Sequence, residues 1–374
     1  MTRYQTNWQS VLHHGAATEE QVNALLSRVP HATVFNTPEW CQAAAGCLAP
    51  GRALHVLTIH DGDGLAAWLP LVCQRERVHG IPVATLRLLG HPFNDRVAMP
   101  ILPGNAELVE TVLDALFACP QLWDLLVLSE LHDPGERKLL AERAPAPVDW
   151  RPCSRSPVLR LSFDSETALR ASYGKALTTR LARARRKLAG AGTVRFERLL
   201  PRPHEVPRLV SLCKAIEDIS WKGSHNLGIF SAPANERFFA DVGVRFAARG
   251  WLDIGMLYVN EKLISYRFGF RHNRVFQDFN LAFDPAYAAC APGRVLLDEM
   301  IVSSLQQELE AVDASRSSVA EPHLLADWTA EGIEHHELWL FRPTWRGRLV
   351  GWARRTLRPA VRRLRARPSG RSHA

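Results

Sequence analysis

One stretch of the sequence has the residue types of a phosphate-binding loop. A predicted strand leads through a loop of small residues into a helix that begins near Pro292. A helix N-terminus directs free N–H groups and the positive end of the helix dipole toward one point, and small residues let an anion come close. Because proline has no N–H, the expected donors are the amides of Cys290, Ala291, Gly293 and Arg294. Many strand-to-helix loops bind nothing, so a purely structural loop is the alternative.

The elements around this loop predict a mixed α/β unit that occurs twice. Alternating apolar residues on either side of an Asp-Gly turn predict a strand hairpin over 53–75. The segment 252–272 repeats the same order and spacing in the second half of the chain. Helical periodicity comes after each hairpin, at 105–118 and at 292–309. We therefore predict two copies of one unit, joined by a linker at 145–157 that is rich in proline and serine.

Length and composition are typical of a globular protein with two domains. The chain has 374 residues, of which 47% are hydrophobic. Its longest apolar run, 64–73, is too short to cross a membrane, and the first residues lack the apolar core of a signal peptide. The seven cysteines contain no Cys-x-x-Cys pair, so we expect reduced thiols, no metal site and a cytoplasmic location.

The net charge of +8 is the sum of unlike segments. Removing the eleven arginines of 342–374 lowers it to −3, and removing the seven basic residues of 170–190 lowers it further to −10. The body is therefore mildly acidic, and two segments are strongly basic. This distribution argues against a general nucleic-acid-binding protein.

Four short motifs resemble those of a known enzyme superfamily. The 283–297 segment is similar to motif A of the GNAT acetyltransferases, in which a Q/R-x-x-G-x-G/A loop holds the coenzyme A pyrophosphate; only the last glycine, Gly293, is kept. The segments 174–196, 217–223 and 36–40 resemble, respectively, the basic helix with its next strand, the E-x-S-W-K-G signature and the N-terminal half of the CelD/BcsL-like branch, which is related to the Fem-type transferases. The resemblance covers about 30–345 and implies tandem GNAT-like domains that transfer an acyl group to an amine or hydroxyl.

The sequence departs from this branch in one place. The branch usually has Asp, several residues and then Tyr-Lys before an aromatic residue. Here Asp313 is followed by a serine-rich segment, and Leu324-Leu325 occupy the Tyr-Lys place before Trp328. A different acceptor or a changed chemistry would result if that lysine contacts substrate in other members.

Acyl transfer requires groups beyond the phosphate loop. The thioester carbonyl needs a backbone donor, and we expect a splayed strand at 266–269 to supply it, with Phe268 and Gly269 as cofactor-binding residues. The acceptor must lose a proton, for which Glu217 and Asp278 are the candidate bases. Tyr287 is the candidate acid for the leaving thiolate. Each of these side chains has a structural alternative, as an ion-pair partner or as part of the core.

The acceptor-binding residues are predicted from two motifs. Arg180 and Arg183 lie on the basic helix, where they would grip a phosphate-bearing acceptor such as a nucleotide sugar or a lipid-linked sugar. Trp221 and Lys222 belong to the E-x-S-W-K-G-like signature. A solvated basic face and local packing are the respective alternatives.

The last 33 residues read as a basic amphipathic helix, broken near Pro359, that would lie on an anionic membrane surface. A frayed tail or a contact with a partner protein is the alternative.

Together these observations predict two tandem GNAT-like units, each a mixed and mostly antiparallel sheet flanked by helices. The predicted domains are 1–150, 151–341 and the tail 342–374. The predicted function is acyl transfer, in the first instance of an acetyl group, from acyl-coenzyme A to a cell-envelope or polysaccharide precursor, without a metal. Two alternatives remain: a Fem-type transferase that uses aminoacyl-tRNA, and a non-catalytic module that binds at a membrane surface.

Overall fold

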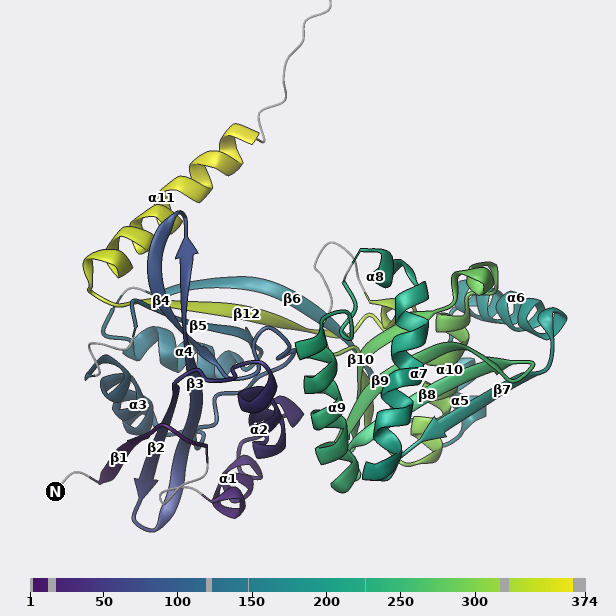
Figure 1. The fold of residues 1–374 in the computed structure, drawn as a ribbon, viewed down its shortest axis with the longest axis horizontal. Helices are drawn as coiled ribbons and strands as arrows, with labels where there is room; N and C mark the ends of the chain where they lie inside the picture. Colours follow the sequence, from purple (N-terminus) through teal and green to yellow (C-terminus); the bar gives the residue numbers. More distant parts are fainter. Residues whose placement is uncertain are drawn as a thin grey trace, which may run out of the picture.

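The computed structural model describes residues 3–12, 18–118, 123–146, 148–225, 227–316 and 323–365. Its strands form one sheet with the order β1-β2-β3-β4-β5-β12-β6-β11-β10-β9-β8-β7. Figure 1 shows this sheet as two halves, each with its own helices, connected by two long strands. The predicted mixed α/β class with two similar units is confirmed.

The N-terminal unit is built on β1–β5. Only β4 and β5 pair in parallel; the other neighbouring pairs among these five strands are antiparallel. Its elements are β1 (Tyr4–Gln9), α1 (Glu19–Leu26), η1 (Val34–Asn36), α2 (Pro38–Cys47), β2 (Leu54–Asp61), β3 (Gly64–Val78), β4 (Ile81–Leu88), α3 (Ala106–Ala118), β5 (Leu125–Leu131) and α4 (Pro134–Arg143). The Thr37 hydroxyl accepts from the Trp40 N–H, and Pro38 occupies the first turn, so the predicted start of α2 is confirmed.

The C-terminal unit repeats that arrangement with β7–β11. Again three antiparallel pairings are followed by one parallel pairing, between β10 and β11. Its elements are α5 (Glu166–Ala171), α6 (Lys175–Ala191), β7 (Val194–Leu199), η2 (Pro203–Glu205), α7 (Val206–Ile219), α8 (Trp221–Ser224), α9 (Pro233–Ala248), β8 (Leu252–Val259), β9 (Lys262–His272), β10 (Val275–Phe283), η3 (Pro285–Cys290), α10 (Pro292–Gln306), β11 (Ala311–Asp313) and η4 (Leu324–Asp327).

One prediction about the junction between the units is wrong. The expected linker at 145–157 is instead most of β6 (Val148–Arg160), and residue 150, the predicted boundary, lies inside this strand. The segment after β6 forms two helices, α5 and α6, which are divided by a turn that ends at Gly174. Proline and serine are tolerated in β6 because the long strand is held by β12 on one side, and by β11 near its end.

The two units exchange strands. Residues 148–157 of β6 pair with β12 (Gly332–Phe341), and residues 158–160 pair with β11 of the C-terminal unit. Strand β12, which comes after the C-terminal unit in the chain, pairs with β5 of the N-terminal unit. Figure 1 shows β6 and β12 side by side between the two halves. Each unit is therefore completed by a strand from the other part of the chain.

An aromatic core joins α2 to α9 across the units. Trp40 of α2 is fully buried and contacts the rings of Phe238, Phe246 and Phe270. Its indole N–H donates to Asn94 Oδ1 over 2.7 Å, which satisfies the one polar atom of the ring. This packing holds the C-terminal sheet against the N-terminal unit.

The chain ends in α11 (Trp345–Arg365), which continues through Pro359, so the predicted break there is wrong. Residues 366–374, part of the predicted tail, lie outside the described residues. Of the helices in the described ranges, none is long and apolar enough to span a membrane. None of the six cysteines within those ranges is in a disulfide bond.

Candidate active site

Strand β10 has an edge that β11 leaves unpaired. The two strands pair only at 275–277 and 311–313, because β11 ends at Asp313 while β10 continues to Phe283. Within the described chain, no strand pairs with residues 278–283 of β10 on this side, which we call the open edge. Its backbone N–H and C=O groups are available to an extended ligand.

We predicted a splayed strand at 266–269, but the strand with an unpaired edge is β10. Phe268 and Gly269 lie in β9, which is paired on one side with β8 and on the other with β10. A Cβ atom at Gly269 would lie 2.5 Å from the Gln277 carbonyl oxygen, so this glycine allows close packing inside the sheet. The backbone irregularity is in β10, between Asp278 and Asn280. Neither Phe268 nor Gly269 therefore presents a free edge.

The loop beyond β10 does lead directly into a helix, as predicted. Ala291 adopts the left-handed conformation with φ 46° and serves as the N-cap of α10. The Ala291 and Arg294 amides donate to the carbonyls of Ala288 and Ala291 over 3.0 Å each, so they are used within the turn. The Gly293 N–H has no acceptor among the described residues. Among the amides of Ala291, Gly293 and Arg294, that of Gly293 is therefore the free donor. Cys290, the fourth predicted donor, is the last residue of η3.

Glu217, a candidate base, is instead the acceptor at the centre of a buried polar cluster. It is 1% exposed, and its carboxylate accepts from the Phe230 N–H at 2.7 Å, the Tyr266 hydroxyl at 3.0 Å and Asn280 Nδ2 at 2.8 Å. Close approach depends on a glycine, because a Cβ at Gly228 would lie 2.0 Å from Glu217 Oε1. With these donors on both oxygens, Glu217 orients Tyr266 and Asn280.

Lys222 is brought to the same cluster by the short helix α8. Its ammonium donates to Asn280 Oδ1, and burial lowers the pKa of this lysine, against the opposing effect of Glu217 and Asp278. A Cβ at Gly223 would lie 2.2 Å from the Asp218 carbonyl oxygen, so only glycine lets α8 fold back on the end of α7. Trp221, by contrast, is 57% exposed.

Asp278 lies at the start of the open edge with one oxygen free. Its Oδ2 pairs with Arg267, whose other nitrogen donates to the Gly293 carbonyl oxygen over 2.8 Å. Its Oδ1 is buried and accepts no hydrogen bond from any described residue. A fully buried carboxylate oxygen without a donor is costly in a folded protein, which is typical of groups reserved for a ligand. Arg267 thus links Asp278 to the first turn of α10.

His323, which we did not predict, completes this group from η4. The Leu325 N–H donates to Nδ1 over 3.1 Å, so the proton of the neutral ring lies on Nε2, 3.5 Å from Asp278 Oδ2. Burial lowers the pKa of His323 to about 4, so the ring is neutral at pH 7. The only signal in the sequence is position: His323 directly precedes Leu324-Leu325, where the expected Tyr-Lys is missing.

The remaining predicted residues lie outside this group. Tyr287 is half-buried on η3, where Lys262 Nζ lies 5.6 Å from the centre of its ring. Arg180 and Arg294 both bind Asp327 of η4. Arg183 is exposed on α6 and pairs with no carboxylate in the described part of the chain. Helix α6 lies beside the loop, since Lys187 Nζ donates to the Ala289 carbonyl over 3.0 Å.

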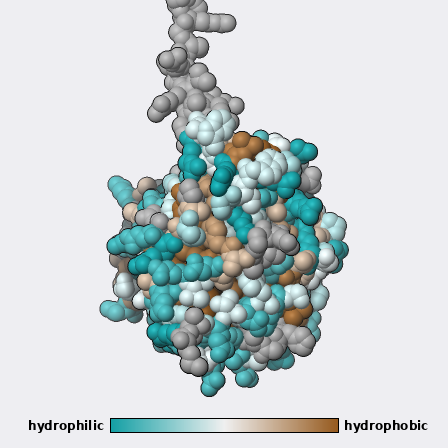
Figure 2. Space-filling view, turned by 90° about the vertical axis from the view of Figure 1, so that its left-hand side faces the viewer, coloured by the Kyte–Doolittle hydropathy of each residue, from teal (hydrophilic) through white to brown (hydrophobic). Residues whose placement is uncertain are grey.

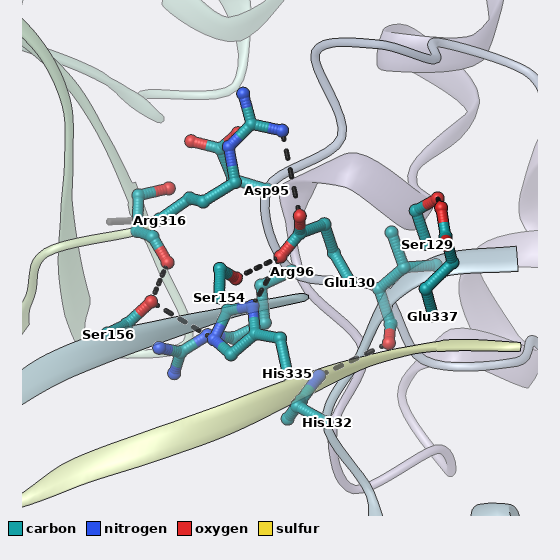
Figure 3. A network of polar contacts seen from close by, with 12 residues as sticks. Asp95, Arg96, Ser129, Glu130, His132, Ser154, Ser156, Arg316, His335 and Glu337 are labelled. Atoms are coloured by element: carbon teal, nitrogen blue, oxygen red, sulfur yellow. Dashed lines mark hydrogen bonds and ion pairs between the residues drawn. The ribbon is translucent and has the colours of Figure 1, made fainter. Parts of the chain in front are cut away.

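The corresponding place in the N-terminal unit is a pocket of about 210 Å³, where β4 and β5 separate, and its lining includes Leu88, Ser129, Glu130 and Arg316. Beyond its parallel pairing with β5, β4 leads into a segment whose Asp95 and Arg96 bind Arg316 and Asp313 of the C-terminal unit. Figure 3 shows Asp95, Arg96 and Arg316 together with Glu130, which accepts from His335 Nδ1 over 2.8 Å. This network ties the units together. No group of three or more His, Cys, Asp or Glu side chains in the described ranges is arranged to hold a metal ion.

Comparison with known proteins finds a family match within the C-terminal unit. Residues 175–323 match the family profile described as the acetyltransferase (GNAT) domain. The C-terminal unit is therefore similar to a GNAT domain. The matched segment begins with α6 and ends at His323, and it includes the open edge and the α10 N-terminus. No curated protein has a significantly similar sequence.

Three solved structures share the overall fold at low sequence identity. A protein of unknown function from Bacteroides thetaiotaomicron is 12% identical with a TM-score of 0.55, and the alignment covers 90% of this chain and all of that one. FemX is 8% identical with a TM-score of 0.59, over 87% of this chain and 96% of FemX. The C-terminal domain of a putative lysylphosphatidylglycerol synthetase from Agrobacterium fabrum is 11% identical with a TM-score of 0.53, over 90% of this chain and 96% of that domain. The expected likeness to GNAT proteins is thus confirmed for residues 175–323, and the likeness to FemX is one of fold.

Proposed function

We propose that the protein is an acyltransferase that moves an acyl group, acetyl in the simplest case, from acyl-coenzyme A to an amine or hydroxyl. The observation that carries this proposal is the open edge of β10, which starts at the free oxygen of Asp278 and leads to the α10 N-terminus. An extended thioester and an acceptor could meet there. All of these parts lie within the segment that matches the GNAT family.

The residues at the α10 N-terminus fit the phosphates of such a donor. The Gly293 N–H is unused and stands at the positive end of a helix dipole. Gly293 is buried, and a Cβ at this position would make ordinary contact, 3.7 Å from Leu281 Cδ1, so a side chain larger than a methyl group would meet Leu281 and Phe283. Acyl-coenzyme A would supply the thioester carbon; the chain supplies the Gly293 amide and the backbone of residues 278–283.

Asp278 is our candidate for the base that takes the acceptor proton. Its Oδ1 is free, whereas the oxygens of Glu217 are occupied by three donors. Arg267 and His323 both contact Oδ2, so they fix the rotation of the carboxylate and thereby the direction of Oδ1. Lys222 lies within electrostatic reach of Asp278 and would stabilise negative charge on a reacting oxygen. An acid role for Tyr287 stays a prediction.

The acceptor in this proposal is a cell-envelope or polysaccharide precursor, with a phosphate group that the basic helix would contact. Arg183 and Arg186 are exposed on α6 and form no ion pair with a described residue, so they remain available. Work on such precursors would suit a protein in the cytoplasm that associates with the inner membrane surface.

Calorimetric titration with acetyl-coenzyme A tests the donor. We expect binding by the wild type and loss of binding in Gly293→Trp, because the indole would meet Leu281 and Phe283 and so disturb the α10 N-terminus. Gly46→Trp is the matched control, since a Cβ at this exposed glycine of α2 has no atom within 4 Å. Absence of binding by the wild type, or equal binding by both variants, would contradict the proposal. If the wild type binds, a mass-spectrometric screen of cell extract with acetyl-coenzyme A would identify the acceptor.

A Fem-type transferase that takes its acyl group from aminoacyl-tRNA is the second candidate, because the chain shares its fold with FemX. The exposed arginines of α6 would then contact RNA phosphates. Binding of aminoacyl-tRNA with a steep salt dependence, together with no binding of coenzyme A, would favour this candidate.

A further inference from the structure

Helix α11 packs on the N-terminal sheet through its smallest residues. Gly347, Val350, Gly351 and Ala353 are buried, and a Cβ at Gly347 would lie 2.3 Å from the Arg342 carbonyl oxygen. The inward-facing Arg354 is 2% exposed, donates to Asp149 and Glu337, and stacks over the ring of Trp339 at 3.7 Å. The helix is therefore firmly docked, and its orientation about its own axis is set.

The opposite face of α11 carries its large apolar side chains. Trp345 is 66% exposed, Leu349 41% and Trp352 54%. Their spacing of four and three residues places them along one stripe of the helix. A surface helix usually buries such residues, so this arrangement is the reverse of the ordinary one. Figure 2, which looks onto the side of the molecule where α11 lies, shows an apolar patch near the top among hydrophilic residues.

The same helix is strongly basic. Residues 345–365 contain eight arginines and no acidic residue. Arg346, Arg348 and Arg355 are exposed beside the apolar stripe. A groove of about 640 Å³ near the start of the helix has three arginines, Arg75, Arg77 and Arg346, and two acidic residues, Glu76 and Asp124, in its lining. Arginines are thus exposed on α11 beside the tryptophans, and further arginines lie on the nearby β3–β4 hairpin.

We propose that this outer face of α11, together with the arginines of the groove, binds the surface of an anionic lipid bilayer. Tryptophan is well suited to the boundary between headgroups and acyl chains, and arginine to lipid phosphates. Trp345, Leu349 and Trp352 would enter the bilayer interface, while the arginines contact headgroups. No described helix can span a membrane, so the contact is peripheral. This inference does not depend on the acyltransferase activity.

Co-sedimentation of the full chain with vesicles tests the proposal. We expect the protein to bind vesicles that contain phosphatidylglycerol, to bind phosphatidylcholine vesicles far more weakly, and to be released by salt. Fluorescence emission of tryptophan should shift to shorter wavelength on binding. Binding that is equal on both lipids would overturn the electrostatic part of the proposal.

Surface variants identify the face. Trp345→Ser/Trp352→Ser should lower vesicle affinity at least tenfold, since two interfacial rings are lost. The matched control is Val11→Ser/Leu200→Ser, because these side chains are comparably exposed, 43% and 47%, but lie outside α11. Arg346→Glu/Arg348→Glu should weaken binding by about fivefold per arginine removed, or more.

Three results would overturn the proposal. In the first, the tryptophan variant binds phosphatidylglycerol vesicles as tightly as the wild type. In the second, the wild type is a dimer by analytical ultracentrifugation, the tryptophan variant is a monomer, and neither binds vesicles; the face would then be covered by a second copy of the chain. Binding of soluble glycerol phosphate without binding of vesicles would likewise count against a bilayer.

Discussion

The two units share a strand order but differ in the length of the connection after the fourth strand. In the C-terminal unit, β10 ends at Phe283 and α10 begins at Pro292, with only η3 between them. In the N-terminal unit, β4 ends at Leu88 and α3 does not begin until Ala106. The longer connection passes Asp95 and Arg96, which bind residues of the C-terminal unit.

This difference changes the groups that line the corresponding place in each unit. The short connection presents the helix N-terminus beside the open edge, whereas the long one contributes to a pocket whose Glu130 and Arg316 are ion-paired. One copy of the fold keeps a free carboxylate oxygen and a free amide, and the other uses its charged groups to hold the two halves together.

The largest effect should come from the base that we assign to the C-terminal unit. Asp278→Asn should lower the turnover number by about 10²–10⁴-fold, because a general base contributes on this order. Affinity for acetyl-coenzyme A should be unchanged by calorimetry. Glu130→Gln in the N-terminal network is the counterpart, and it should leave turnover within about twofold while lowering stability. Equal loss of turnover in both variants would remove the distinction between the units.

The next effect is on stability. Glu217→Ala should lower the free energy of unfolding by about 3 kcal/mol, since three buried donors lose their acceptor. Urea denaturation measures this change. Asp218→Ala is the adjacent control: this carboxylate is 51% exposed and pairs only with Lys214 on the same helix, so its loss should cost about 0.5 kcal/mol or less. A small effect at Glu217 would show that its hydrogen bonds do not stabilise the site.

Replacing glycine with alanine should lower the free energy of unfolding at one site in the C-terminal unit and raise it at one site in the N-terminal unit. Gly269→Ala should lower the free energy of unfolding by about 1–3 kcal/mol, because the new methyl group would collide with the Gln277 carbonyl and the Phe276 ring. Gly46→Ala on the exposed face of α2 should raise it by up to about 1 kcal/mol, since alanine is the better helix former. Thermal unfolding of both variants tests this. Destabilisation by both, or by neither, would show that packing at Gly269 is not as tight as the structure indicates.

The smallest effect is on pH dependence, and its sign should differ between the units. Burial lowers the pKa of His323 from 6.5 to about 4, so the unfolded chain binds its proton more tightly and stability falls as the pH drops from 6.5 toward 4. Burial raises the pKa of Asp95 from 3.8 to about 7, aided by Glu130 and opposed by Arg316; stability therefore falls as the pH rises from 3.8 toward 7. His323→Gln should remove the first slope, and Asp95→Asn the second.

Urea unfolding between pH 4.5 and about 7.5 would measure both slopes. The two variants should change the curve in opposite directions. A change of the same sign in both would contradict the protonation states that we assign to these groups.

Local signals predicted much of the fold and some of the site. The Thr37-Pro38 start of α2, the two strand hairpins and the helix after the 285–291 loop are explained by capping, alternation and turn residues. Residue type and position also pointed to Gly293 and Asp278, whose roles stay predictions. The open edge was assigned to the wrong strand, because pairing on both sides of β9 depends on β8 and β10 and is not visible in β9 itself.

The sequence by itself determined two similar α/β units, a loop that enters a helix with small residues, and a basic C-terminal segment, because each depends on neighbouring residues. Only the tertiary structure decided that β6 and β12 are exchanged between the units, and that His323 reaches Asp278 from η4. It also decided that α11 turns its tryptophans outward. These features arise from contacts between distant residues, where packing and burial select one arrangement among several that the local sequence allows.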